Sequence, residues 1–383
     1  DLYVGVTGYD EVNMISSSFA KSKGVKTIAR INKIEYIDKP ISIDEFRWMG
    51  IDIAICPDLV AANRMARILI TPTLLDVEQF GKGKIYLLHS KVYENAWIAN
   101  KQLKDAHLPV SCDIISIYRG GNAIIPSGKE IIYPFDEVIA VIGQQKDIPK
   151  VGELLGHKTN VLKEELAEKI MIVGATRTGI HLAKMLENNA TISLIDNSEE
   201  RCAIASEILT NTTVVRGSAT EKELLMSENV GAADAFVATT EREGVNTIAC
   251  LLAKKLGAKI AIALIDHLEL KTTLHDMGID LLISPRIATV NEILRYAATS
   301  GSITSLSILH SGEARIIEAE INQDAKIAGK KISKISLPNG VVAATIVRGE
   351  EVIIPHGDTI IEVGDRVLFY VKTEATKKLE KLL

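Results

Sequence analysis

The sequence has 383 residues, more than one hydrophobic core usually supports, so we expect about two to four domains. Its 44 Lys and Arg against 49 Asp and Glu give a net charge of −5, and the lack of a basic block argues against a nucleic acid partner. Apolar runs such as 260–265 are too short to span a bilayer, and the four cysteines stand singly, which argues against a disulfide framework or a zinc site.

The chain opens with a stretch that recurs later. Residues 1–26 match residues 234–259 at ten positions without a gap, and GIDIAICP at 50–57 corresponds to GIDLLISP at 278–285. Short buried apolar runs alternate with longer amphipathic stretches in this block, which is typical of βα units and a parallel sheet. We therefore predict an α/β domain over residues 1–75, the first A block.

A different block follows at 76–143 and also recurs. Residues 96–143 align without gaps to 325–372, with 17 identities. In the second copy, apolar and polar residues alternate through VVAATIVRGEEVIIPHGDTIIEVGDRVLFYV, with Gly-containing turns about every eight residues. The pattern predicts a small antiparallel sheet with tight turns, so we expect each B block, 76–143 and 301–383, to be a small α+β domain.

A polar stretch with Pro and Gly, residues 144–168, is expected to link the two halves. The second A block begins near Lys169, and 65 residues, 169–233, precede Asp234, whereas nothing precedes its counterpart Asp1. We therefore expect the first A block to lack its N-terminal half, and the chain to be part of a protein about 65 residues longer.

The second A block, residues 169–300, predicts six strands, each followed by a helix. A parallel sheet made of such units, with helices on both faces, is doubly wound. The predicted fold is α/β, with two Rossmann-like doubly wound parallel-sheet domains, the first N-terminally truncated, and a small α+β domain after each. The six strands are expected near 169–173, 191–195, 213–215, 234–239, 259–265 and 280–283.

The strongest indication of a binding site is KIMIVGATRTGIHLAKMLENN at 169–189, a buried strand, a glycine turn and an amphipathic helix. In a dinucleotide fold such a turn holds a pyrophosphate over the helix N-terminus, where free N–H groups and the helix dipole favour an anion. Gly174 makes the turn, and Gly179 lets the helix pack on the strand. Thr176 stands where GxGxxG has its middle glycine, so its side chain either pushes the pyrophosphate away or donates a hydrogen bond to it.

The ends of the next strands carry further polar candidates. Asp196 ends the second strand, where a carboxylate accepts hydrogen bonds from ribose hydroxyls. The alternative is that Asp196 or Asn197 only caps the next helix. The stretch VVRGSAT at 214–220 ends the third strand near the expected adenine, or else forms a loop with Thr220 as a helix cap.

Ligands of open α/β sheets bind beyond the carboxyl ends of the strands. Thr239 and Thr240 end the fourth strand and are expected to face that crevice, and Thr7 and Gly8 hold the matching place in the first copy. The predicted nucleotide-binding residues are Gly174, Ala175, Thr176, Arg177, Thr178, Gly179, Asp196, Asn197, Gly217, Ser218, Ala219, Thr239, Thr240, Thr7 and Gly8.

This A, B, A, B order resembles the TrkA-type peripheral subunits of Trk potassium-uptake systems, tandem proteins of the regulator-of-potassium-conductance (RCK) family. The resemblance covers essentially the whole chain. Its motifs are VTGYDEVNM at 6–14, TIARI at 27–31, GATRTG at 174–179, GSATEKELL at 217–225, and the RGGNAIIPSG and RGEEVIIPHG turns of the B blocks. The chain departs from the family at two positions, since the family usually has Gly where Thr176 stands and Asp where Ser218 stands.

The resemblance implies a cytoplasmic protein at the inner face of the cell membrane. A homo-oligomeric ring of nucleotide-sensing Rossmann lobes would attach to an integral membrane potassium channel or transporter subunit of the TrkH type and gate it. The family's nucleotide-binding positions carry over to Gly174, Gly179, Asp196 and the loop at Gly217. The implied ligand is NAD or NADH, with ATP or ADP as alternatives.

We expect a sensor and not an enzyme. A dehydrogenase needs an acid or base beside its nicotinamide, but the sequence has no Tyr-x-x-x-Lys, and His181, His267, His275 and His356 stand in unrelated contexts. We therefore assign no catalytic residue and no metal ligand. The alternatives are an NAD-dependent oxidoreductase, which would turn over NADH, and a regulator of another cation channel or antiporter.

Overall fold

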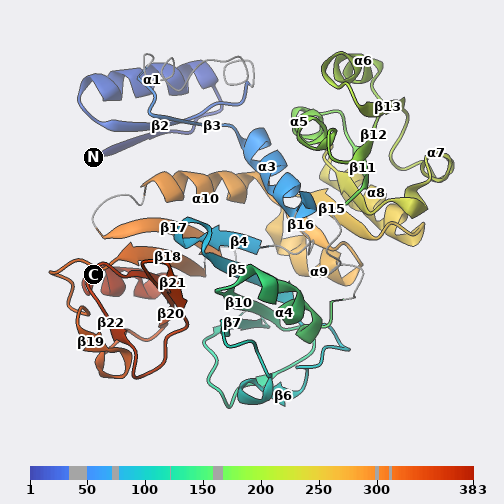
Figure 1. Ribbon diagram of the computed structural model, residues 1–383. Coiled ribbons are helices and arrows are strands. Elements are labelled where there is room, and N and C mark those ends of the chain that lie inside the picture. Colours follow the sequence, from blue (N-terminus) through green and yellow to red (C-terminus); the bar gives the residue numbers. More distant parts are fainter. Residues whose placement is uncertain (34–49, 71–76, 121, 158–166, 298–301, 310–312) are drawn as a thin grey trace. The chain divides into compact units, whose positions relative to one another are not determined.

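The computed structural model describes residues 1–33, 50–70, 77–120, 122–157, 167–297, 302–309 and 313–383. The chain forms two compact units (Figure 1), one made of Asp1–Ile70 with Glu165–Ile293 and the other of Thr71–Glu164 with Leu294–Leu383. The two A blocks thus share one unit and the two B blocks share the other. The domain boundaries expected at 75/76 and 300/301 lie outside the described residues.

The second A block forms a six-stranded sheet in the order β13-β12-β11-β14-β15-β16, and every neighbouring pair is parallel. The order runs outward in opposite directions from β11 and β14, which confirms the doubly wound topology. Each strand agrees with its prediction to within one residue at either end. The strands are β11 Lys169–Val173, β12 Thr191–Asp196, β13 Thr212–Arg216, β14 Ala235–Ala238, β15 Ile260–Leu264 and β16 Leu281–Ile283.

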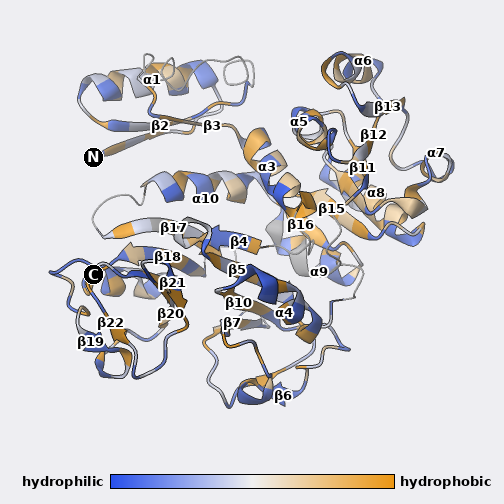
Figure 2. Ribbon diagram, in the orientation of Figure 1, coloured by the Kyte–Doolittle hydropathy of each residue, from blue (hydrophilic) through white to orange (hydrophobic). Residues whose placement is uncertain are grey.

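A helix follows each of these strands, as predicted. Because helices cover both faces of a parallel sheet, its central strands are apolar throughout. All five residues of β15 are buried, and this strand is orange in Figure 2. The helices are α5 Arg177–Leu186, α6 Glu199–Ile208, α7 Lys222–Ser227, α8 Glu243–Lys255, α9 Lys271–Asp276 and α10 Pro285–Ala297.

The first A block repeats the later half of this arrangement in the residues that the structure describes. Its strands form a parallel sheet in the order β1-β2-β3, equivalent to β14-β15-β16. Lys21 Nζ lies 2.7 Å from Asp52 Oδ1, and the matching Lys254 Nζ lies 2.9 Å from Asp280 Oδ2. The repeat thus extends to side-chain pairs. The elements are β1 Leu2–Gly5, α1 Asp10–Ser22, β2 Lys26–Arg30, β3 Ile53–Ile55 and α3 Pro57–Ile70.

Helix α3 of the first copy packs against α5 of the second copy. Two hydrogen bonds accompany this packing. Arg177 Nη1 donates to the carbonyl oxygen of Asn32 at 2.9 Å, and Thr178 Oγ1 donates to Asp58 Oδ1 at 2.9 Å. The first turn of α5 is therefore tied to the first copy of the A block.

Each B block forms a five-stranded antiparallel sheet, as the alternating pattern predicts. The strand orders are equivalent, β4-β5-β10-β7-β8 and β17-β18-β23-β20-β21, and a two-stranded pair accompanies each sheet. The first copy has β4 Val77–Phe80, β5 Ile85–Lys91, β6 Lys101–Gln102, β7 Cys112–Arg119, β8 Asn122–Ile124, β9 Ile131–Ile132 and β10 Glu137–Ile142. The second has β17 Ile303–Leu309, β18 Ala314–Glu320, β19 Lys330–Lys331, β20 Val341–Arg348, β21 Glu351–Ile353, β22 Ile360–Ile361, β23 Arg366–Lys372 and α11 Thr376–Glu380.

The two B sheets share one apolar cluster. Ile139 and Val141 of β10 pack there with Leu368 and Tyr370 of β23. Ser116 Oγ donates to the Tyr370 hydroxyl at 3.0 Å, so the buried phenol oxygen has a polar partner. One face of each B sheet thus packs against the other copy.

The expected linker at 144–168 is partly wrong. Helix α4, Ile148–Leu154, lies within it, and Val151 and Leu155 are buried in the core of the first B sheet. Pro149 does not break this helix because it stands in its first turn, where no intrahelical N–H is needed. Packing against the sheet stabilises a helix too short to form alone. Residues 158–166 of the expected linker lie outside the described residues.

Glu187 follows the last residue of α5 and fastens the chain that leads into β13. Its buried carboxylate accepts hydrogen bonds from Thr210 N at 3.0 Å and Asn211 N at 2.9 Å, and it pairs with Lys184 at 2.9 Å. Burial alone would raise its pKa, but the backbone N–H groups, Lys184 and Thr212 together lower that pKa to about 2.

We expect Glu187→Gln to lower the free energy of unfolding by about 1 to 3 kcal/mol at neutral pH, because an amide has one acceptor oxygen where the carboxylate has two. Since the folded-state pKa is depressed, the carboxylate's contribution is present above about pH 4.5 and is lost as the pH falls toward 2. Denaturant titrations of wild type and variant should therefore converge in acid. A difference that stays constant with pH would contradict this assignment.

Candidate functional site

The glycine turn between β11 and α5 has the backbone that the sequence predicts. Gly174 has φ +103°, and a Cβ there would lie 2.8 Å from Thr240 N. A Cβ on Gly179 would lie 2.0 Å from the carbonyl oxygen of Gly174 and 2.7 Å from Thr239 Oγ1. The first glycine is required by the turn, and the second by the close approach of helix and strand.

Thr176 has hydrogen-bond partners of its own within the protein. It is the N-cap of α5, and its Oγ1 accepts a hydrogen bond from Gly179 N at 3.2 Å. The same hydroxyl donates to the carbonyl oxygen of Thr239 at 2.9 Å. Its proton is therefore already donated within the protein, and it occupies one of the helix N–H groups that a phosphate could otherwise bind.

Thr239 anchors the turn to the next strand. Its buried Oγ1 lies 3.0 Å from the carbonyl oxygens of both Val173 and Gly174. The end of β14 and the end of β11 are thus joined at the point where the order of the sheet reverses.

A threonine–asparagine pair holds the loop after β14, and it recurs in the first copy. Asn246 Oδ1 accepts from Thr240 N at 2.9 Å and from Thr240 Oγ1 at 2.6 Å. In the first copy Asn13 Oδ1 accepts from Thr7 N at 2.8 Å and Thr7 Oγ1 at 2.7 Å, and Gly8 follows as an exposed residue. The predicted set omitted both asparagines, although they are among the ten identities of the repeat.

Asp196 is buried at the end of β12 and binds backbone groups with both carboxylate oxygens. Oδ2 accepts from Ala175 N and Oδ1 accepts from Ser198 N, each at 2.8 Å. Ser198 is the cap of α6 and accepts from Arg201 N at 3.3 Å, so the alternative that Asp196 or the exposed Asn197 is the cap is wrong. Asp196 fastens the glycine turn and retains lone pairs for a further donor.

The loop after β13 closes against β12. Gly217 N donates to the carbonyl oxygen of Asp196 at 2.8 Å, and Ala219 is buried in the core of the sheet. Ser218 Oγ lies 3.0 Å from Thr220 Oγ1. Helix α7 has no side-chain cap, so the alternative role of Thr220 as a cap is wrong.

A pocket of about 500 Å³ lies beyond the carboxyl ends of β11 and β14, at the switch point of the sheet, and extends to the ends of β15 and β16. It brings the first turn of α5 together with the loop after β14. Five of the predicted residues line it, namely Thr176, Arg177, Thr178, Thr239 and Thr240. The other predicted residues are not part of the lining: Gly174, Ala175, Gly179, Asp196, Asn197, Gly217, Ser218, Ala219, Thr7 and Gly8. Four carboxylates that the sequence did not single out do line it. The polar lining residues are Asp58, Thr176, Arg177, Thr178, Thr239, Thr240, Glu241, Glu243, Asn246 and Asp266.

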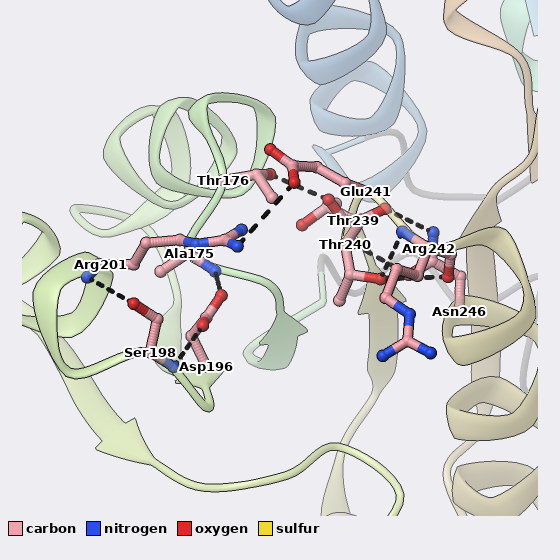
Figure 3. Close-up of polar contacts among 10 residues, drawn as sticks. All are labelled: Ala175, Thr176, Asp196, Ser198, Arg201, Thr239, Thr240, Glu241, Arg242 and Asn246. Atoms are coloured by element: carbon pink, nitrogen blue, oxygen red, sulfur yellow. Dashed lines mark hydrogen bonds and ion pairs between the residues drawn. The ribbon is translucent and has the colours of Figure 1, made fainter.

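An ion pair stands beside this turn. Arg201 Nη2, on α6, lies 3.9 Å from Glu241 Oε2, in the loop after β14, and Figure 3 shows the two side chains pointing toward one another. The predicted set contains neither residue. The only sequence signal for them was their nearness to Asp196 and Thr240 in the chain.

Three further observations concern metal binding, a surface histidine and the length of the helices. Among the residues placed in the structure, no group of three or more His, Cys, Asp and Glu could hold a metal ion. The exposed His267 has a raised pKa because its Nδ1 lies 2.7 Å from the Glu243 carboxylate, and this contact stabilises the protonated ring, so this histidine is paired at the surface. No helix among the placed residues is both long and apolar enough to cross a membrane.

Comparison with known families and proteins agrees with this arrangement. The TrkA-N domain matches residues 170–285, and the TrkA-C domain matches 88–156 and 316–383. Trk system potassium uptake protein TrkA homolog 1 of Methanosarcina mazei is 34% identical, over 100% of this chain and 85% of its own length. Trk system potassium uptake protein TrkA of Halomonas elongata is 33% identical, over 97% of this chain and 81% of its own length.

A solved structure shares the fold. The GsuK channel bound to NAD superposes with a TM-score of 0.53 at 18% identity, over 100% of this chain and 66% of that channel. At this identity the likeness concerns the fold alone. The matches to the two domain families and the full-length similarity to the relatives place the chain in the TrkA family of Trk system potassium uptake proteins.

Proposed function

We propose that this protein is a nucleotide-sensing regulatory subunit that gates a membrane potassium transporter or channel. The observation that carries the proposal is the pocket at the switch point of the second A sheet, bounded by a turn that needs both Gly174 and Gly179. Open α/β sheets bind nucleotides at this place. The relatives are named for potassium uptake, and the GsuK structure of the same fold holds NAD.

The proposed ligand is NAD or NADH, with ATP and ADP as the competitors to be tested. Asp196 favours a ribose with free hydroxyls, since a 2′-phosphate would meet its carboxylate. The cap formed by Thr176 leaves fewer N–H groups for the pyrophosphate than a glycine would. We therefore expect binding to rely on side chains around the turn as well as on the helix N-terminus.

The proposed mechanism is allosteric. A ligand in the pocket contacts the first turn of α5, which is tied to the first copy through Arg177–Asn32 and Thr178–Asp58. Binding that differs between two arrangements of the copies would change their populations, with a coupling free energy of about 1 to 3 kcal/mol. The names of the relatives fit a regulatory subunit, and we propose that the protein is not an enzyme.

The proposed assembly is a homo-oligomeric ring in the cytoplasm, bound at the inner face of the membrane to a potassium transporter subunit of the TrkH type. We propose that the A blocks, 1–75 and 169–300, sense the ligand. The B blocks, 76–143 and 301–383, would hold copies together through sheet packing, as they do within the chain.

Thermal unfolding with NAD, NADH, ATP and ADP tests the proposal. One nucleotide at about 100 times its dissociation constant should add about 2.7 kcal/mol and raise the melting temperature by about 5 to 10 °C. Asp196→Ala should abolish that ligand-dependent rise, measured against its own ligand-free value. Asp234→Ala is the matched control, because Asp234 also accepts two backbone N–H bonds, from Glu168 and Lys169, at the amino end of the sheet.

Three results would count against parts of the proposal. If none of the four nucleotides shifts the transition, nucleotide sensing is wrong. If Asp196→Ala keeps the full shift, Asp196 does not bind the ligand. Turnover of NADH with a metabolite would make the protein an oxidoreductase instead.

A further inference from the structure

The two copies of the A block differ in charge at the edge of the crevice. Glu241 stands where the first copy has Gly8, and the same threonine–asparagine bonds hold the loop in both copies. A Cβ built on Gly8 meets no atom within 4 Å. The loop therefore has room for a side chain in either copy. The two copies differ at this position because the second carries a negative charge, and not because the first lacks space for a side chain.

The Glu241 side chain reaches across the glycine turn. Glu241 follows β14, and its partner Arg201 lies on α6, which follows β12. Strand β11 lies between β12 and β14 in the sheet. The pair, 3.9 Å apart, thus crosses the carboxyl end of β11, where the glycine turn begins (Figure 3).

This is the place where a dinucleotide fold holds phosphates. The Arg201 guanidinium suits a phosphate, whereas the Glu241 carboxylate repels one. The two side chains are 39% and 77% exposed, and exposed pairs of this kind add little to stability. An anion can therefore replace the carboxylate on Arg201 at small cost.

We propose that Arg201 and Glu241 form a displaceable charge gate. Arg201 binds the phosphates of the ligand, and Glu241 pairs with Arg201 in its absence and selects against ligands of high negative charge. This inference rests on the proposed nucleotide-binding function and adds which class of nucleotide the site prefers. A dinucleotide such as NADH is favoured over ATP, because ATP carries more negative charge past the same carboxylate.

Calorimetric titration of Glu241→Gln in the full chain with NADH and with ATP tests the gate. At physiological salt we expect the Kd for ATP to fall about tenfold and the Kd for NADH about threefold. Glu241→Gly, which copies the first A block, should give the same changes. The matched control is Glu207→Gln, which removes an exposed carboxylate from α6 and should leave both constants within about twofold.

Arg201→Gln should weaken both ligands about tenfold, because a charged partner of the phosphates is lost. When Glu241→Gln is added to Arg201→Gln, the Kd for ATP should change by less than about twofold, since Glu241 is no longer held across the turn. Full additivity of the two substitutions would overturn the gate.

The failure of the gate and the failure of the proposed function give different results. If wild type binds NADH and ATP but Glu241→Gln has no larger effect than Glu207→Gln, the gate is wrong and the nucleotide site stands. If neither wild type nor any variant binds either ligand, the proposed function is wrong and the gate with it. Ligand-free melting temperatures verify that each variant is folded.

Discussion

Gly179→Ala should be among the most destabilising single substitutions in the A unit. Its Cβ would lie 2.0 Å from the carbonyl oxygen of Gly174 and 2.7 Å from Thr239 Oγ1. The first of these is a backbone atom, so relief requires α5 to move away from β11. Overpacking of this kind costs about 3 kcal/mol or more, which corresponds to a fall in melting temperature of about 6 to 12 °C.

Gly244→Ala is the matched control for that loss. Gly244 lies in the first turn of α8, and a Cβ there meets no atom within 4 Å. Alanine is the better helix former, so this variant should be unchanged or more stable by up to about 1 kcal/mol. Calorimetry of both variants measures the difference. A Gly179→Ala protein that melts like wild type would show that α5 does not approach β11 as closely as described.

Asp365→Ala should destabilise the B unit by about 2 to 3 kcal/mol. The buried carboxylate accepts from Arg348 Nε at 2.8 Å, from Arg348 Nη2 at 2.9 Å and from Glu362 N at 2.7 Å. Removing it leaves Arg348 Nε and the Glu362 N–H without their acceptor, and an unpaired buried donor costs more than the hydrogen bond itself is worth. Denaturant unfolding gives the loss.

The repeat supplies an internal test of this cost. Asp136 accepts from Arg119 Nε at 2.8 Å and Nη2 at 2.7 Å in the same way, so Asp136→Ala should cost about as much. Glu362→Gln is the control, because its carboxylate also meets Arg348, at 2.7 Å, but is 55% exposed. We expect it to cost less than about 1 kcal/mol. A loss in Glu362→Gln as large as in Asp365→Ala would contradict the role of burial.

Much of the fold could be predicted because its periodicities are local. The runs that became β11 and β15 are apolar along their whole length, as strands buried on both faces must be. The B sheets could be predicted from the alternation of apolar and polar residues, with glycine turns between the strands. Helix α4 could not be predicted in this way, since its seven residues are too few to form a helix alone and are stabilised by burial of Val151 in the core of the first B sheet.

The residues of the candidate site also fall into those that could be predicted from the sequence and those that could not. Gly174 and Gly179 could be identified from spacing alone, because the turn and the helix contact need a residue without a Cβ. The partners of Thr176 could not, because Thr239 lies 63 residues away in the chain. The pairing of Arg201 with Glu241 likewise depends on which strands flank β11.

The sequence by itself determined the A, B, A, B repeat, the strands of the second A sheet and the glycine turn, because each depends on residues near one another in the chain. Only the tertiary structure decided that the two A blocks share one compact unit and the two B blocks share the other. It also decided that Asp58 of the first copy accepts a hydrogen bond from Thr178 of the second, and that Thr176 caps α5. Those contacts join residues whose separation is set by sheet order and by helix packing. No local pattern of residue types encodes such distances.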